Sequence, residues 1–302
     1  MLSFRRLRRA GLVVALVAGL AAPATAMATT APTPSAPTPT VPGAPTGLRY
    51  VNMGDSYSAG SGIAPPAPGA PPQCTQSALN WGHDLATAKG YQLTDVSCGG
   101  AQTKDFTTAQ FPGVAPQLDA LSSSTQLVTL TIGGNDNNVF VNAITQCGTA
   151  AARTAGQGSP CKDQYGSSFV DTINKSTYPN LVKALAKVRV KASRAKVGIS
   201  GYLQILPATG GCYPIMPVAS GDVPYLNQIE STLNDAVRRA AARTGVTFID
   251  EAATSTGHDA CQPIGTRWVE PVAGSTNFVP VHPNALGEAA MATRARTVLG
   301  LG

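Results

Sequence analysis

An alternation of strand-like and helix-like segments constrains the fold most strongly. Residues 127–132 predict a strand covered on both faces, because Leu, Val, Thr and Ile follow one another in a nearly continuous apolar run. Residues 226–244 predict a helix, with apolar residues at helical spacing and Gly245 at the end. At least four such alternations occur, which implies parallel strands joined by right-handed crossovers. We therefore predict a three-layer α/β/α sandwich with a central parallel sheet.

The other segments agree with this architecture. A strand is expected at residues 196–206, although Gly198 and Gly201 lower its strand propensity. Residues 64–72 are rich in proline and alanine and should form an irregular loop, since proline suits neither a helix interior nor a central strand. Further strands are expected at residues 48–53, 91–97 and 246–249, and further helices at residues 80–89, 114–121, 178–192 and 285–299.

The first 26 residues have the pattern of a secretory signal peptide. Four arginines lie among the first nine residues, an uncharged apolar run covers residues 10–22, and Ala-Thr-Ala ends at Ala26. The apolar run is shorter than the roughly 20 residues that a membrane span needs. We expect cleavage after Ala26, export of the protein, and no stable membrane insertion once the leader is removed.

The leader is followed by a spacer and then by one domain. Residues 27–46 repeat Ala, Pro and Thr without charge, so they cannot bury enough surface to fold and should form an extended linker. The region 47–302 is long enough for one sizeable core and contains no second linker or repeat. A single domain is expected there, with a monomer as the default.

The charge balance argues against a nucleic-acid partner. The formal net charge is +6, but four of the positive charges are the leader arginines, so the rest of the chain is near +2. A nucleic-acid-binding protein should instead concentrate basic residues in one patch.

The six cysteines form an even set in a chain with an export signal, which favours three disulfides. Six cysteines allow 15 different pairings, so the sequence alone does not assign them. None of the spacings resembles a Cys-x-x-Cys pair, and the three histidines lie far apart. We expect neither a metal site nor a cofactor.

Polar and glycine residues follow the predicted strands at the points where open α/β sheets carry their chemistry. Ser56 follows the first strand, Gly100 the second and Asn135 the third. His282 lies between two prolines, in a stiff loop just before the last helix. A serine nucleophile needs a base and donors for an oxyanion, and these residues supply both kinds of group.

The motifs around these residues, in this order, resemble the four blocks of the SGNH (GDSL) hydrolase family. The blocks are Gly54-Asp55-Ser56, Gly100, Gly133-Gly134-Asn135-Asp136 and His282-Pro283-Asn284. Within that family the chain is similar to secreted actinomycete lipases and esterases. The resemblance implies Ser56 as nucleophile and His282 as general base and then general acid. It also implies an oxyanion hole made by the backbone N–H groups of Ser56 and Gly100 and the side-chain amide of Asn135.

The same resemblance implies disulfides between neighbours along the chain, namely Cys74 with Cys98, Cys147 with Cys161 and Cys212 with Cys261.

One departure from the family pattern concerns the histidine. The family usually has an aspartate three residues before it, and here that position is Val279. We expect a Ser-His dyad in which the Val279 backbone carbonyl accepts the imidazole N–H. A distant acid such as Asp250 or Asp259 is the alternative. Asp55 and Asp136 are expected to be structural.

Taken together, these features predict a secreted carboxylic-ester hydrolase of the lipase or esterase type. The apolar and proline-rich loops at residues 64–72 and 215–218 favour fatty-acyl esters. Acetylated polysaccharides are an alternative substrate for the same site, and a secreted binding protein with a vestigial site is a less favoured one. The α/β-hydrolase fold is a rival for a serine esterase, and its nucleophile turn needs Gly-x-Ser-x-Gly. Here Ser58 occupies the second glycine position, so the sequence does not fit that fold.

Overall fold

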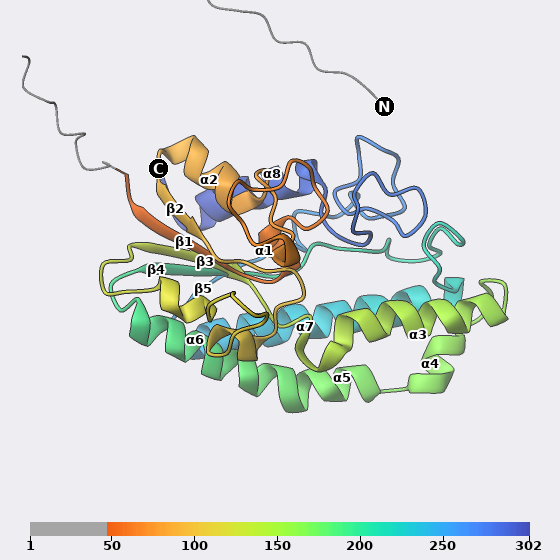
Figure 1. The fold of residues 1–302 in the computed structure, drawn as a ribbon. Helices are drawn as coiled ribbons and strands as arrows, with labels where there is room; N and C mark the ends of the chain where they lie inside the picture. Colours follow the sequence, from red (N-terminus) through yellow and green to blue (C-terminus); the bar gives the residue numbers. More distant parts are fainter. Residues whose placement is uncertain (1–46) are drawn as a thin grey trace, which may run out of the picture. The chain divides into compact units, whose positions relative to one another are not determined.

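A parallel five-stranded sheet in the order β2-β1-β3-β4-β5 forms the centre of the domain (Figure 1). The computed structural model describes residues 47–302, and the predicted signal peptide (1–26) and linker (27–46) lie outside the described residues. The strands are β1 (Arg49–Gly54), β2 (Gln92–Asp95), β3 (Leu127–Thr131), β4 (Lys196–Ser200) and β5 (Thr247–Ile249). The predicted parallel sheet is confirmed.

Helices cover both faces of this sheet (Figure 1), which confirms the predicted three layers. On one face α2 (Trp81–Lys89) packs against α8 (Ala285–Val298). On the other face α6 (Tyr178–Lys191) packs against α7 (Val223–Thr244). The strands alternate between the two cores: Val128 and Leu130 of β3 face α6 and α7, and Leu127 belongs to the core under α2 and α8.

Capping residues fix the start of both helices on the first face and the end of α2. The Asn80 side chain accepts a hydrogen bond from the His83 N–H at the start of α2, and Gly90 ends that helix with a φ of 64°. The Asn284 side chain accepts from the Leu286 and Gly287 N–H groups at the start of α8. Asn284 thereby fixes the position of the chain two residues after His282.

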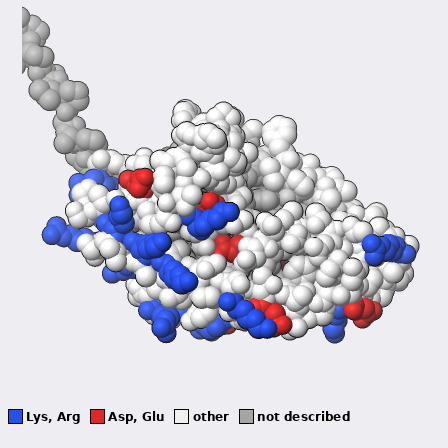
Figure 2. Space-filling model, turned by 60° about the horizontal axis from the view of Figure 1, so that its bottom comes forward, with Lys and Arg blue, Asp and Glu red and all other residues white. Residues whose placement is uncertain are grey.

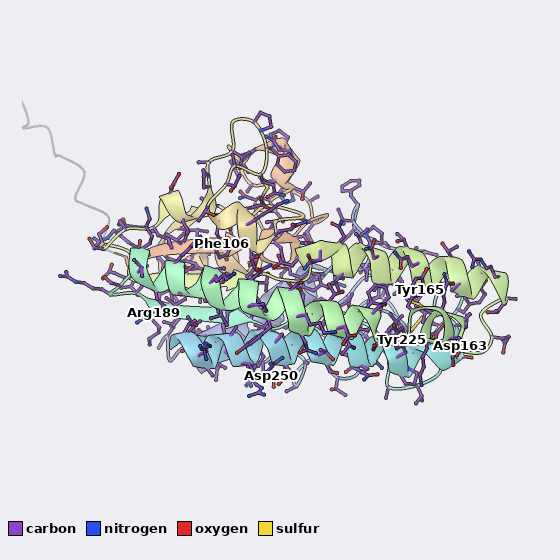
Figure 3. The ribbon with its side chains drawn as sticks, turned by 90° about the horizontal axis from the view of Figure 1, so that it is seen from below. Phe106, Asp163, Tyr165, Arg189, Tyr225 and Asp250 are labelled. Carbon is purple, nitrogen blue, oxygen red and sulfur yellow. A yellow bond between two sulfur atoms is a disulfide. The ribbon has the colours of Figure 1, made fainter. Side chains whose placement is uncertain are left out.

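Three helices beyond the sheet, one of 15 residues and two of six and five, are absent from the sequence prediction. These are α3 (Val139–Arg153), α4 (Pro160–Tyr165) and α5 (Ser168–Thr172), and α5 continues through the π-helical turn η5 (Ile173–Thr177) into α6. In Figure 3, α6 and α7 lie side by side, with Arg189 at one end of this helical layer and Tyr165 of α4 at the other. The sequence does carry a signal for α3, because its buried residues Val139, Ala143, Cys147 and Ala150 follow helical spacing, and the sequence prediction missed it.

Two predicted elements differ in extent. The strand expected at residues 196–206 ends at Ser200. Beyond it, the backbone of Tyr202 leaves the sheet and pairs with the Asn234 side chain through two hydrogen bonds of 2.7 and 3.0 Å. The helix expected at residues 114–121 is only the 3-10 turn η3 (Gln117–Ala120).

The three disulfides join Cys74 to Cys98, Cys147 to Cys161 and Cys212 to Cys261, the pairs that the family resemblance implied. The first holds the loop of Gly100 against the loop that follows the short helix α1 (Ser56–Ala59). The second joins α3 to α4. Among the helices of residues 47–302, none has the length and apolar character needed to cross a membrane.

Candidate active site

Ser56 and His282 are in direct contact, although 226 residues separate them in the sequence. Ser56 is the first residue of α1, immediately after β1, and the Asp55 side chain caps this helix by accepting from the Tyr57 N–H. The Ser56 Oγ lies 2.7 Å from the His282 Nε2, and both side chains are buried. A serine hydroxyl and an imidazole at this distance can exchange a proton.

A backbone carbonyl orients the His282 ring, and it belongs to Pro280 rather than to Val279. The His282 Nδ1 lies 2.9 Å from the Pro280 carbonyl oxygen. Because a carbonyl can only accept, Nδ1 carries the proton and Nε2 is free to accept from Ser56. The expectation that the Val279 carbonyl fills this role is therefore wrong.

The reason for this difference is the backbone at Val281, whose φ of 60° is rare for a β-branched residue. This left-handed conformation turns the chain so that the carbonyl two residues before His282 faces its ring. Hydrogen bonds on both sides hold Val281: its N–H donates to the Glu270 carbonyl at 2.9 Å, and its own carbonyl accepts from the Tyr57 hydroxyl at 3.0 Å. The strained turn is thus fixed to the same short helix that carries Ser56.

Aromatic rings enclose the histidine. Tyr57 and Phe140 lie with ring centroids 5.3 and 5.7 Å from that of His282. Burial lowers the pKa of His282 from its ordinary value, and the hydrogen bond to Pro280 opposes part of this shift. The imidazole is consequently neutral at pH 7, which is the form that can accept a proton.

No carboxylate within residues 47–302 bonds to the His282 ring. Asp259 accepts from the Cys261 N–H at 2.9 Å, and Asp250 accepts from the Ala253 N–H at 3.3 Å. Glu270 forms a buried ion pair with Arg267 at 2.6 Å. The two aspartates weighed as triad acids are therefore occupied elsewhere, and the geometry is that of a dyad.

Asp250→Asn and Asp259→Asn are each expected to keep turnover within about threefold of the wild type, because neither carboxylate touches the histidine. The measurement is kcat on a soluble p-nitrophenyl ester, with circular dichroism to check folding. Removal of a true triad acid costs about 10⁴-fold in kcat. A loss of that size in a folded variant would contradict the dyad.

The groups expected to bind an oxyanion lie at the ends of three adjacent strands, β2, β1 and β3. Within residues 47–302, neither the Ser56 N–H nor the Gly100 N–H donates a hydrogen bond, so both are free for a ligand. The Asn135 amide donates one bond of 3.2 Å to the Ala101 carbonyl, which leaves its second N–H available. Gly100 adopts a φ of 75°, which suits a residue without a side chain.

Asp55 and Asp136 hold these loops in place. Asp55 accepts from the Thr131 hydroxyl at 2.9 Å and from the Tyr202 hydroxyl at 2.6 Å, and burial raises its pKa to about 6. Asp136 accepts from the N–H and hydroxyl of Thr103 at 2.8 and 2.7 Å and so ties the Asn135 loop to the Gly100 loop. These contacts agree with structural roles. Tyr202 has no sequence signal that would have placed it here.

An apolar cavity opens beside the histidine. It is lined by Phe140 and Ala143 of α3, by Leu226 and Leu233 of α7, and by Met216 and Val281 from loops. Glu230 of α7 also lines it and accepts from the Ile205 N–H at 3.0 Å. Burial raises the pKa of Glu230 to about 8, so its carboxyl is neutral at pH 7. Within residues 47–302, no group of three or more His, Cys, Asp or Glu side chains is arranged to hold a metal ion.

Comparisons with known proteins show the family of the chain. The model of the GDSL-like Lipase/Acylhydrolase family matches residues 53–290. Lipase 2 from Streptomyces coelicolor is 57% identical over 256 residues, which cover 84% of this chain and 86% of that protein.

Solved structures add two further relatives. The crystal structure of phospholipase A1 from Streptomyces albidoflavus NA297 matches with a TM-score of 0.69 and 28% identity, over 82% of this chain and 98% of that one. The extracellular lipase of Streptomyces rimosus has the same fold, with a TM-score of 0.68 and 24% identity over 83% of this chain and 99% of that one. The resemblance that the four sequence blocks carry is confirmed. The chain belongs to the GDSL-like lipase/acylhydrolase family, and it is a carboxylic-ester hydrolase.

Proposed function

We propose that this protein is a secreted lipase or esterase that cleaves fatty-acyl esters through an acyl-enzyme on Ser56. The observation that carries the proposal is the 2.7 Å contact between the Ser56 Oγ and the His282 Nε2. The free N–H groups beside it and the apolar cavity supply the two other parts that ester cleavage requires.

In the first half of the reaction, the Ser56 Oγ attacks the ester carbonyl carbon and its proton passes to the His282 Nε2. The Pro280 carbonyl accepts from Nδ1–H throughout and keeps the ring aligned. The Ser56 N–H, the Gly100 N–H and the Asn135 amide stabilise the oxyanion of the tetrahedral intermediate. The C–O bond to the alcohol then breaks, and His282 protonates the departing oxygen.

In the second half, water takes the place of the alcohol. His282 accepts a proton from this water, whose oxygen attacks the acyl-enzyme carbonyl. The bond to the Ser56 Oγ breaks, His282 returns the proton to Ser56, and the free carboxylic acid leaves. The carbonyl of Pro280 carries no full charge, so it stabilises the imidazolium less than a carboxylate would.

The cavity supports fatty-acyl esters as the substrate class. Its lining is almost entirely apolar, which suits a hydrocarbon chain and offers little to an acetylated sugar. The relatives named lipases and a phospholipase A1 support the same choice. Secretion is supported by the predicted leader at residues 1–26 and by three disulfides, which persist outside the cytosol.

A series of p-nitrophenyl esters of increasing chain length, set beside acetylxylan, tests the substrate class. Each buried CH₂ group contributes about 0.8 kcal/mol, so we expect kcat/KM to rise by up to about fourfold per CH₂ until the cavity is filled. A maximum at the acetyl ester, with faster turnover of acetylxylan, would show that the cavity does not receive the acyl chain.

Glu230 should make the preference for long chains depend on pH. Below pH 8 its carboxyl is neutral, and above pH 8 it places a charge in the wall of the cavity. We expect the ratio of kcat/KM for a long-chain ester to that for the acetyl ester to fall as pH rises through 8. Glu230→Gln cannot ionise and should keep a flat ratio. An equal fall in both proteins would assign the effect to another group.

The same shift has a consequence for stability. Between its ordinary pKa of 4.5 and the native value of about 8, Glu230 keeps a proton in the folded state that the unfolded chain releases. The free energy of unfolding therefore falls as pH rises through this window, and Glu230→Gln should reduce that fall.

A further inference from the structure

The loops around the Ser56–His282 site and the start of α3 carry exposed apolar side chains. We propose that these side chains form a docking surface for a neutral lipid interface, with Phe278 as its main anchor. We define the apolar rim as Val141, Tyr213, Ile215, Val272 and Phe278. The inference adds an interaction surface to the proposed function and rests on it only for the identity of the substrate.

Exposure distinguishes the rim from an ordinary surface. The Phe278 side chain is 89% exposed, and the other four members are between 38% and 49% exposed. A phenylalanine held almost fully in water makes no contribution to the core. Large apolar side chains that gather on one surface mark a site that is covered by a partner or a membrane.

Hydrogen bonds place the rim at the entrance of the active site. The Phe278 N–H donates to the carbonyl of Gly62, in the loop after Ser56, at 3.1 Å. The Ala273 N–H donates to the Ile215 carbonyl at 3.0 Å, which joins two of the rim loops. Val272 also lines the apolar cavity, and Val141 follows the cavity residue Phe140. The rim and the cavity are thus continuous.

The segments that build this edge of the domain contain no charged residue. Asp, Glu, Lys and Arg are absent from residues 56–83, 137–152, 197–221 and 271–287. Basic residues gather instead at the basic edge, where α6 leads into β4, namely Lys187, Arg189, Lys191, Arg194 and Lys196, and Figure 3 labels Arg189 at that end of the domain. In Figure 2 most Lys and Arg lie on the left and along the lower edge, with one further group at the right edge, and the upper right is a broad uncharged area.

Exposed apolar side chains without neighbouring charges favour a neutral lipid surface as the partner. A nucleic acid or an anionic membrane would need basic residues on the docking face, and the rim segments have none. A neutral lipid surface needs only apolar side chains that can enter its hydrocarbon boundary. It also holds the acyl chains that the neighbouring cavity fits, so one contact serves docking and substrate entry.

The test measures binding of the domain to phosphatidylcholine vesicles by co-sedimentation, in a Ser56→Ala background so that the lipid stays intact. We expect Phe278→Asp to weaken binding by at least about tenfold, since burying a phenylalanine contributes about 1.5–3 kcal/mol. Val190→Asp is the matched control, because Val190 is 79% exposed on α6 at the basic edge. This control should bind as tightly as the parent.

Two further readouts separate docking from catalysis. With Ser56 restored, Phe278→Asp should keep kcat/KM on a soluble short-chain ester and lose activity on a lipid emulsion. Parent binding should also change little with salt, because no charges lie on the rim.

Three results would overturn the inference. Unchanged vesicle binding by Phe278→Asp would show that Phe278 does not anchor the protein to the lipid surface. Binding that requires anionic lipid and weakens with salt would move the contact to the basic edge. A dimer in sedimentation velocity that Phe278→Asp dissociates would make the rim an interface between two copies of the chain. Because binding is measured without turnover, failure of the proposed ester substrate would not produce any of these results.

Discussion

Ser56→Ala is expected to lower kcat on a soluble p-nitrophenyl ester by at least about 10⁴-fold, while the protein stays folded. Without the hydroxyl no acyl-enzyme forms, and His282 has no nucleophile to activate. The free N–H groups and the cavity remain, so a small rate above the uncatalysed one should persist. Steady-state kinetics and circular dichroism on the purified domain check both parts of this expectation.

Ser61→Ala is the matched control for that variant. Ser61 is buried five residues further on, and its hydroxyl bonds to Thr75 at 2.6 Å rather than to the histidine. Its loss should cost about 1 kcal/mol of stability and leave kcat close to the wild-type value. Equal activity in Ser56→Ala and Ser61→Ala would contradict the assignment of the nucleophile.

Asn135→Ala is expected to lower kcat by about 100- to 1000-fold and to leave KM nearly unchanged. The amide hydrogen that Ala101 does not use is available to the oxyanion, which forms only as the ester carbonyl becomes tetrahedral. The loss should therefore appear in the transition state rather than in substrate binding. Separate determination of kcat and KM distinguishes these cases.

Asn142→Ala, in α3, controls for loss of an asparagine in the same region. Its activity should match the wild type, since alanine suits a helix interior at least as well. Wild-type kcat in Asn135→Ala would remove this side chain from the oxyanion hole, and a rise in KM alone would assign it to substrate binding.

The residues of the site could be predicted because they lie at strand ends, and the order of strands brings strand ends together. Ser56, Gly100 and Asn135 follow β1, β2 and β3, which are neighbours in the sheet. Asn284 marks the start of α8 by its capping side chain, and this places His282 in the loop before it. The strand ends and the helix start are local signals, and the parallel α/β architecture is what places them at one edge of the sheet.

The orientation of His282 could not be predicted, because it depends on a backbone conformation that the sequence disfavours. Valine rarely adopts a φ of 60°, and Val281 does so only because Tyr57 and Glu270 bond to its backbone from distant segments. The prediction that the Val279 carbonyl accepts from the imidazole assumes an ordinary extended backbone between Val279 and His282. The strained turn makes Pro280 the acceptor instead.

The apolar cavity could not be predicted from the sequence either. Its wall combines Ala143 of α3 and Leu233 of α7 with Met216 from a loop, and each of these reads as an ordinary core residue. The helix α3 itself could have been predicted, because its buried residues follow helical spacing. Glu230 has no motif, and only its burial among these apolar residues makes it unusual.

Trapping the covalent intermediate tests the central claim most directly. The protein is treated with a serine-directed organophosphate, digested and analysed by mass spectrometry. We expect one adduct, on the peptide that contains Ser56, and its formation should be strongly slowed in His282→Ala, because that variant has no base for the hydroxyl proton. An adduct on a different serine, or labelling of Ser56 at the same rate without His282, would contradict the account.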